Sequence, residues 1–256
     1  MNDARTFVSA GGHRLEYRWI AGNAERPTLI FLHEGMGSLA MWKDFPDALA
    51  NATDCPALVY SRYGYGWSDT LTEPFQPDYM HREAGDALPD LMRAFEVDRP
   101  VLIGHSDGAS IALIAAGEGT IAPGALILEA PHVFVEDVTI ASIEAARETF
   151  STTDLAERMA PYHRDPKSSF QGWNDIWLNP DFRDWNIEKL LPAIACPIQI
   201  IQGEDDEYGT SEQIRKIEAQ ISGPWETRIL ADCRHSPHRD QRELTLQTMA
   251  AFIGKL

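Results

Sequence analysis

The feature that most constrains this chain is a serine between two glycines, placed directly after a short apolar run. Residues 104–108 read Gly-His-Ser-Asp-Gly and follow Pro-Val-Leu-Ile at 100–103. Small residues at helical spacing come next, over 109–116. A strand, a sharp turn that carries the serine and a helix are the context in which a G-x-S-x-G motif exposes a hydroxyl above a sheet. The pattern predicts that Ser106 is a nucleophile at the carboxyl end of a buried strand.

The rest of the chain predicts an α/β fold. Residues 6–9 and 15–19 alternate in polarity around Gly11-Gly12, which is typical of an antiparallel hairpin. Helical patterns alternate with five further short apolar runs, which predict strands at 28–32, 57–60, 101–103, 125–128 and 197–201, and a last strand is expected at 226–230. Further helices are expected near 41–51, 80–96, 211–221 and 239–253. This alternation predicts a mostly parallel eight-stranded sheet flanked by helices.

The alternation stops after Val135 and resumes at Pro197. Residues 137–193 carry helical patterns without a convincing strand, and they hold three of the seven tryptophans. We therefore expect a core formed by 1–136 and 194–256, interrupted by a helical cap over 137–193. The alternative is that this segment is an ordinary part of the core.

Composition excludes several partner classes. The chain has 256 residues and a formal net charge of -17, so we expect it to bind neither nucleic acid nor an anionic membrane surface. No signal peptide and no apolar run of about 18 residues is found, which predicts a cytoplasmic protein without a membrane span. The cysteines form no C-x-x-C pair and are expected to be buried, reduced thiols; they are Cys55, Cys196 and Cys233.

A serine nucleophile needs a base and an acid that orients the base. Among eight histidines, His235 is the best base, because it lies between the last predicted strand and the last helix, with His238 as the alternative. Such a loop lies at the carboxyl edge of the sheet, where Ser106 also emerges. Four consecutive carboxylates at 204–207 follow another buried strand and offer the acid.

These motifs, in this order, resemble those of the α/β-hydrolase fold family, in its capped serine hydrolase or esterase form. The resemblance rests on His-Glu-Gly-Met-Gly-Ser at 33–38, Ser-Arg-Tyr-Gly-Tyr-Gly-Trp-Ser-Asp at 61–69, and the motifs at 104–108, 203–206 and 233–238. It implies a catalytic triad of Ser106, His235 and Asp206, with Asp205 as the alternative acid. Arg62 and Asp69 are expected to brace their own loop.

The resemblance also implies an oxyanion hole made of two backbone N–H groups, those of Gly35 and Asp107. Glu34 stands where the family commonly has glycine. Because a carboxylate near an oxyanion would be unfavourable, we expect neighbouring groups to hold the Asp107 side chain away from the substrate.

Two other motifs are weak. Residues 35–40 satisfy the G-x-G-x-x-A pattern of dinucleotide sites, but they follow the third strand and lack an acidic residue at the end of the next strand. His235 and His238 lie in a turn without a third metal ligand nearby in the sequence. We therefore expect no cofactor and no metal.

An ester is the least demanding substrate for such a triad, so we expect a carboxylic ester hydrolase that acts on a small-molecule ester through an acyl-enzyme. A lactonase, a thioesterase, a C–C bond hydrolase and a non-catalytic ligand receptor are the alternatives. Residues after the strands and in the cap are candidates for the substrate pocket: Glu34, Met36, His132, Phe134, Trp173 and Trp177.

Overall fold

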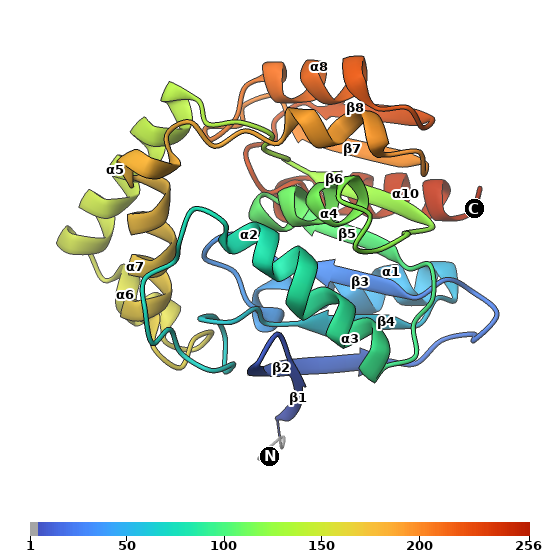
Figure 1. Ribbon diagram of the computed structural model, residues 1–256, viewed down its shortest axis with the longest axis horizontal. Coiled ribbons are helices and arrows are strands. Elements are labelled where there is room, and N and C mark those ends of the chain that lie inside the picture. The colour runs from blue at the N-terminus through green and yellow to red at the C-terminus, as the bar shows by residue number, and fades with distance from the viewer. Residues whose placement is uncertain (1–4) are drawn as a thin grey trace.

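A single twisted sheet organises the molecule (Figure 1). The computed structural model describes residues 5–256, and within them eight strands pair in the order β1-β2-β4-β3-β5-β6-β7-β8. The strands are β1 (Thr6–Ala10), β2 (His13–Ile20), β3 (Leu29–Leu32), β4 (Ala57–Tyr60), β5 (Val101–His105), β6 (Ala125–Glu129), β7 (Ile198–Gly203) and β8 (Trp225–Leu230). The predicted fold class is confirmed.

The strand pairing follows the sequence patterns. β1 and β2 form the expected antiparallel hairpin, and β2 pairs antiparallel with β4. All other neighbours are parallel, so the carboxyl ends of β3 to β8 meet at one edge. Every residue of β3, β4, β5, β6 and β7 is buried, because helices cover both faces of a parallel sheet.

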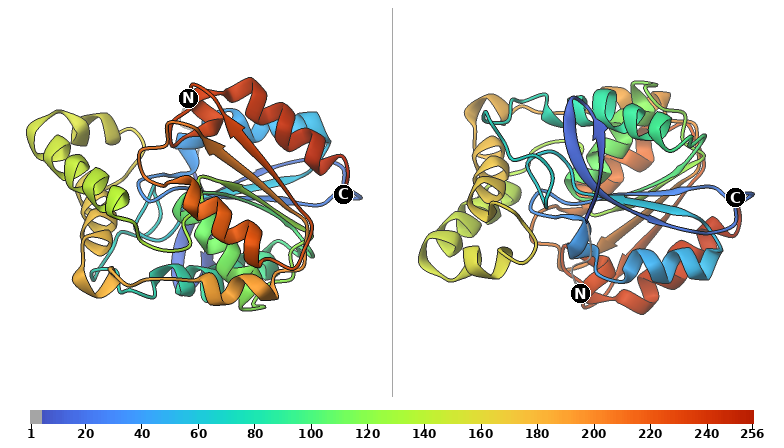
Figure 2. Two further views of the ribbon diagram at one scale, coloured as in Figure 1. Left: turned by 90° about the horizontal axis from the view of Figure 1, so that it is seen from above. Right: turned by 90° about the horizontal axis from the view of Figure 1, so that it is seen from below.

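Helices pack on both faces of the sheet (Figure 2). On one face lie α1 (Phe45–Thr53), α9 (Pro237–Asp240) and α10 (Arg242–Ile253). Apolar side chains of α1 and α10 share a core with β3 and β5. On the other lie α2 (Tyr79–Arg82), α3 (Leu88–Ala94), α4 (Asp107–Gly117) and α8 (Ser211–Gln220). No helix within residues 5–256 has both the length and the apolar character needed to cross a membrane.

Two predicted helices are divided in the structure. The helix predicted over 80–96 consists of α2, a π-helical turn at Glu83–Ala87 and α3. Pro89 lies in the first turn of α3 and has no N–H to donate to the carbonyl four residues earlier. The helix therefore widens into the π-helical turn just before it. The helix predicted over 239–253 is interrupted at Gln241, between α9 and α10. The one predicted over 41–51 begins at Phe45, next to Pro46, after a 3₁₀ turn at Leu39–Trp42.

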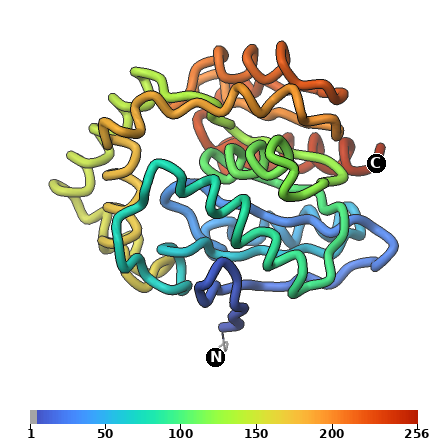
Figure 3. The backbone as a smooth tube through the Cα atoms, viewed as in Figure 1, coloured from blue at the N-terminus to red at the C-terminus, as the bar shows by residue number. Residues whose placement is uncertain are grey.

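The segment 137–193 leaves the sheet after β6 and returns to β7 (Figure 3). It forms α5 (Asp137–Thr152), α6 (Leu155–Met159) and α7 (Pro166–Trp177), which lie together beside the sheet (Figure 1). Two 3₁₀ turns follow, Pro180–Phe182 and Glu188–Ala193. The second packs against α4 and α8, so the last part of the segment is attached to the helical layer of the core.

The thiol prediction is correct at two of three positions. All three cysteines are free, and Cys55 and Cys233 are buried. Cys196 is half-buried, because it stands just before β7 at the end of the sheet opposite Ser106.

Candidate active site

Ser106 occupies a strained turn between β5 and α4. Its φ of 54° and ψ of -117° lie in a region that a residue with a side chain rarely adopts. The turn is tight because α4 runs directly against β3: a Cβ at Gly108 would lie 2.0 Å from the carbonyl oxygen of Leu32. The second glycine of the motif is thus required by close approach of two backbones, and the turn holds Ser106 at the carboxyl edge of the sheet.

The structure brings Ser106, His235 and Asp206 together. His235 Nε2 lies 3.0 Å from Ser106 Oγ, and His235 Nδ1 lies 2.8 and 2.9 Å from the two Asp206 carboxylate oxygens. Because a carboxylate can only accept, Nδ1 carries the proton and Nε2 is free to accept the Ser106 hydroxyl proton. This is the geometry of a base oriented by an acid and directed at a hydroxyl.

Asp206 is held as a carboxylate. Gln202 Nε2 donates to one of its oxygens at 2.7 Å, and the N–H groups of Tyr208 and Gly209 donate to the other at 2.8 and 3.2 Å. Burial opposes the charge, but the adjacent His235 and the Tyr208 N–H outweigh it and lower the pKa of Asp206. The carboxylate therefore stays ionised and keeps His235 in the productive tautomer.

The alternative base and acid lie elsewhere. His238 Nδ1 is 2.7 Å from Glu129 in a buried pair, and its ring packs on Trp42. Asp205 is held by its backbone N–H, which donates to the Cys233 carbonyl at 2.9 Å. The carboxylate that contacts His235 is that of Asp206. The geometry therefore favours His235 over His238 as the base and Asp206 over Asp205 as the acid.

The two predicted oxyanion donors are both available. Neither the N–H of Gly35 nor that of Asp107 donates to another protein group within the described part of the chain. Asp107 begins α4, where the first N–H groups of a helix have no partner in the helix itself. Gly35 lines the same cavity as Ser106, and its own Cβ would lie 2.0 Å from Trp173 Cδ1, so only glycine fits beneath this indole.

The carbonyl of Glu34 is held by three donors. His33 Nδ1–H lies 2.7 Å from it, and Gly37 N–H and Arg62 Nη2 each lie 3.0 Å away. Such multiple donation fixes the path of the backbone in a loop that has no regular structure. From its position in the motif we expected Arg62 to brace its own loop; in the structure it also contacts Glu34 and Asp107, in two other segments.

The Asp107 side chain points away from the site, as expected. Tyr79 Oη–H donates to one carboxylate oxygen at 2.7 Å, and Trp177 Nε1–H donates to the other at 3.2 Å. Arg62 Nη2 lies 3.5 Å from the first oxygen, in an ion pair in which both side chains are at most 2% exposed. These three partners, from three different segments, neutralise and fix the charge.

Glu34 forms a second carboxylate–imidazole pair beside the first. Glu34 Oε2 lies 3.5 Å from His105 Nδ1, and the N–H at the other ring nitrogen of His105 donates to the His235 carbonyl at 2.7 Å. Burial alone would lower the pKa of His105, but the Glu34 carboxylate raises it. Burial likewise opposes the charge on Glu34, and the His105 imidazole holds the pKa of Glu34 well below its usual range. No sequence pattern indicated this pair, apart from the unusual glutamate itself.

A cavity of about 250 Å³ opens onto Ser106 and His235. Of the six predicted pocket residues, Glu34, Met36, Trp173 and Trp177 line it. The remaining wall includes residues that sequence reasoning missed: Met41, His105, Ile143, Glu207, Tyr208, Arg234 and Arg239.

Two predicted pocket residues lie outside this lining. His132 is packed behind His235, between that ring and the indole of Trp177, at centroid distances of 5.7 and 5.3 Å. Burial first, and then the neighbouring His235, lower the pKa of His132 to about 3. Phe134 pairs with Asn186 in an isolated β-bridge. Both follow β6, as expected, but neither lines the cavity.

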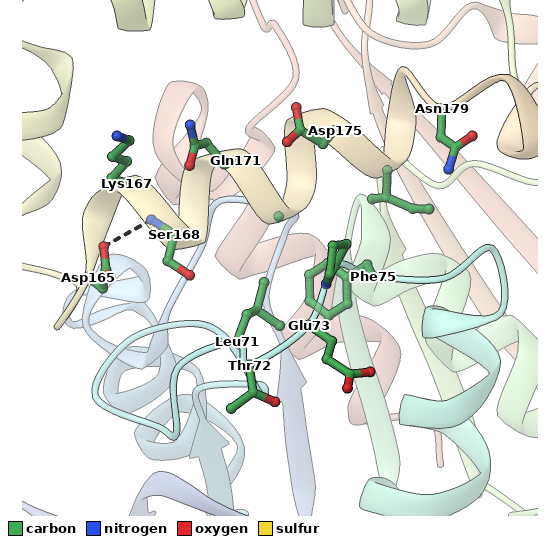
Figure 4. A pocket seen from close by; sticks show the side chains of 13 residues that line it. Leu71, Thr72, Glu73, Phe75, Asp165, Lys167, Ser168, Gln171, Asp175 and Asn179 are labelled. Carbon is green, nitrogen blue, oxygen red and sulfur yellow. Dashed lines mark hydrogen bonds between the residues drawn. The ribbon is translucent and has the colours of Figure 1, made fainter.

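A second, larger cavity of about 400 Å³ lies between α7 and the loop 71–75 (Figure 4). Figure 4 shows polar side chains of α7 along one wall, with Asp165 accepting the Ser168 N–H. No predicted site residue lines it. The smaller cavity, which is lined by Ser106, His235 and Gly35, is therefore the candidate active site.

Comparison with known proteins agrees with this fold. The serine hydrolase BPHL of Homo sapiens is 30% identical over 193 residues, which cover 71% of this chain and 63% of the human protein. The Mus musculus protein of that name is 27% identical over 216 residues, 78% of this chain and 69% of the mouse protein. A thermophilic esterase from Thermogutta terrifontis superposes with a TM-score of 0.77 at 17% identity, covering 98% of both chains.

The family assignment rests on a match to most of the sequence. A model described as "Alpha/beta hydrolase family" matches residues 29–248, from β3 into α10. This range contains the serine, the histidine and the aspartate that meet at the cavity. The chain belongs to the alpha/beta hydrolase family.

Proposed function

We propose that this hydrolase cleaves carboxylic esters, with Ser106 as nucleophile, His235 as general base and Asp206 as orienting acid. The observation that carries the proposal is the unbroken hydrogen-bonded chain from Asp206 through His235 to Ser106 Oγ, at the wall of a cavity. A serine hydroxyl attacks a carbonyl only when a base removes its proton, and here Nε2 is placed to do so.

The reaction has two halves. Ser106 Oγ bonds to the ester carbonyl carbon while its proton passes to His235 Nε2, and the carbonyl oxygen becomes an oxyanion facing the N–H groups of Gly35 and Asp107. The C–O bond to the alcohol then breaks, and His235 returns the proton to the leaving alkoxide. Water attacks the acyl-enzyme with His235 as base, and it releases the carboxylic acid and regenerates Ser106.

The cavity favours small substrates. Its apolar wall is formed by Met36, Met41, Ile143, Trp173 and Trp177, which suit a short acyl or aryl group. We propose that 137–193 acts as a cap, since the two tryptophans that face the cavity come from α7 of this segment. A cavity of about 250 Å³ favours short acyl chains over long ones.

A p-nitrophenyl ester series from acetate to palmitate tests the proposal. We expect turnover by the wild type with an optimum at short chains, and a fall of ~10³-fold or more in Ser106→Ala. Ser110→Ala is the matched control: Ser110 is also buried, lies in the first turn of α4 just after Ser106, and donates to the His132 carbonyl at 2.6 Å rather than to His235. We expect this variant to keep its activity.

Two results would contradict the proposal. If Ser106→Ala retains turnover, or loses no more than Ser110→Ala, Ser106 is not the nucleophile. If the wild type reacts with a fluorophosphonate but hydrolyses no ester in the series, the serine is active and the substrate is of another class, to be sought among lactones, thioesters and diketones.

A further inference from the structure

Arg62 is buried inside the molecule, and it contacts two segments that meet at the candidate active site. Its side chain is 2% exposed, on the loop after β4. Nη2 lies 3.0 Å from the Glu34 carbonyl oxygen and 3.5 Å from Asp107 Oδ2. Its guanidinium carbon also lies 4.9 Å from the ring centroid of Tyr65. One nitrogen atom thus joins the loop after β3 to the first residue of α4.

The first contact bears on the N–H of Gly35. The Glu34 carbonyl and the Gly35 N–H belong to the same peptide unit, which is planar, so the direction of one sets the direction of the other. There are no cis peptide bonds in the described chain, and C=O and N–H therefore point in opposite directions. A donor that pulls the carbonyl toward the interior turns the N–H toward the cavity.

The second contact bears on the N–H of Asp107. The carboxylate of Asp107 is tied by Arg62, Tyr79 and Trp177, and its backbone N–H is the other free donor beside Ser106. Fixing the side chain restricts the backbone from which it extends, at the start of α4. Arg62 is the partner that this residue shares with the Glu34–Gly35 peptide.

We propose that Arg62 is a positioning residue, which sets the distance and direction between the two N–H groups of the oxyanion hole; this rests on the proposed function. Arginine suits the task because its guanidinium is rigid, permanently charged and able to donate along several directions. Lysine keeps the charge but lacks this planar set of donors. Arg62 touches no substrate, and it acts through Glu34 and Asp107.

The test must separate positioning from loss of stability. Removing Arg62 alone leaves the Asp107 carboxylate buried without its ion-pair partner, which destabilises the fold for reasons unrelated to the oxyanion. We therefore choose two variants, Arg62→Lys and the double variant Arg62→Met/Asp107→Asn, in which no charge is left unpaired. Tyr60→Phe is the matched control: it removes a buried hydrogen bond to Glu83, 2.7 Å long, two residues before Arg62.

Two measurements report on the oxyanion hole. The first is kcat and KM for p-nitrophenyl butyrate, with active sites counted by fluorophosphonate labelling so that unfolded protein does not contribute. The second is the Kd of phenylboronic acid, whose tetrahedral adduct with a serine places an oxygen in the oxyanion hole. We expect kcat to fall about 10²-fold in both Arg62 variants, the cost of a displacement of about 1 Å, with KM unchanged. The Kd should rise in parallel, and Tyr60→Phe should match the wild type in both.

The proposal is overturned if Arg62→Lys keeps wild-type kcat and boronate affinity, or if KM rather than kcat changes. If Arg62→Lys does not fold, the double variant decides by the same two measurements. If the wild type hydrolyses no ester but binds the boronate, the ester function fails and the Kd comparison still decides the role of Arg62. If the wild type binds no boronate, there is no oxyanion hole for Arg62 to position, and both proposals fail.

Discussion

Replacing Trp177 by phenylalanine tests whether the link between α7 and the start of α4 stabilises the fold. Trp177 is 2% exposed, and its indole N–H donates to Asp107 Oδ1 at 3.2 Å. Phenylalanine keeps most of the apolar ring but removes the donor. The carboxylate oxygen then stays buried with one hydrogen bond fewer, and a buried charged acceptor that loses its donor costs more than a neutral one.

Trp185 provides the control, because it belongs to the same aromatic cluster but has no such bond. It is 8% exposed, its ring lies 6.2 Å from that of Trp177, and its Nε1 has no partner among the described residues. Both substitutions lose similar ring volume, so the transfer and cavity costs largely cancel. The difference is the bond to a charged group, about 1.5–3 kcal/mol. Removing the unpaired N–H of Trp185 also relieves a desolvation penalty, which widens the gap.

Urea unfolding at neutral pH measures both variants. We expect Trp177→Phe to be less stable than Trp185→Phe by at least about 1.5 kcal/mol, or about 3 °C in Tm. A double-mutant cycle with Asp107→Asn should reduce the effect of Trp177→Phe, because the acceptor is then neutral. Equal losses in the two single variants, or an effect of Trp177→Phe that Asp107→Asn leaves unchanged, would refute the reasoning.

Three further predictions concern the site and its support. Asp206→Asn should keep the fold but lower kcat about 10⁴-fold, because the amide stabilises the wrong tautomer of the base; kinetics on p-nitrophenyl butyrate will check this. Glu34→Gln should lower the NMR titration midpoint of His105. The pKa of His105 is raised in the folded state, so its contribution to the free energy of unfolding is fully present below about pH 6.5 and is lost as pH rises through the folded pKa. Glu34→Gln should remove this pH dependence of the free energy of unfolding. An unchanged titration midpoint, or an unchanged pH dependence, would count against the pair. Gly108→Ala should destabilise by roughly 1–3 kcal/mol or more in thermal unfolding, whereas Gly85→Ala, where a Cβ meets nothing within 4 Å, should be tolerated.

The fold followed from the sequence because its determinants are local. Continuous apolar runs predicted the five fully buried strands, and alternation around Gly11-Gly12 predicted the antiparallel hairpin. Helix boundaries were less accurate, since Pro89 and Pro46 act on hydrogen bonds that the apolar pattern does not contain.

The meeting of Ser106, His235 and a carboxylate was predictable for a related reason, whereas the choice of Asp206 within 204–207 came from the family resemblance. The carboxyl ends of parallel strands share one edge, so residues after β5, β7 and β8 were bound to meet there, although 129 positions separate Ser106 from His235. Chain order and strand register decide such a meeting without any knowledge of side-chain packing.

The support of the site could not be predicted in this way. Arg62 was assigned to its own loop, and the pairing of Glu34 with His105 depends on where two side chains point after packing. His132 shows the limit most plainly: it follows β6 as a pocket residue should, yet it faces the back of His235. Residues that end a strand can be placed at an edge, but which side of the edge they face is set by neighbours distant in the sequence.

The charge beside Ser106 can be understood from these contacts. A free carboxylate on the residue after Ser106 would oppose the negative charge that develops on a carbonyl oxygen nearby, and the opposition would be strong in a buried site. Here the Asp107 carboxylate faces Arg62, Tyr79 and Trp177, so its charge is balanced on the side away from the cavity. The N–H of the same residue, next to Ser106, donates to no other group in the described part of the chain. An acidic residue at this position is therefore compatible with an oxyanion hole, provided that the buried arginine is present, and this ties the identity of residue 107 to that of residue 62.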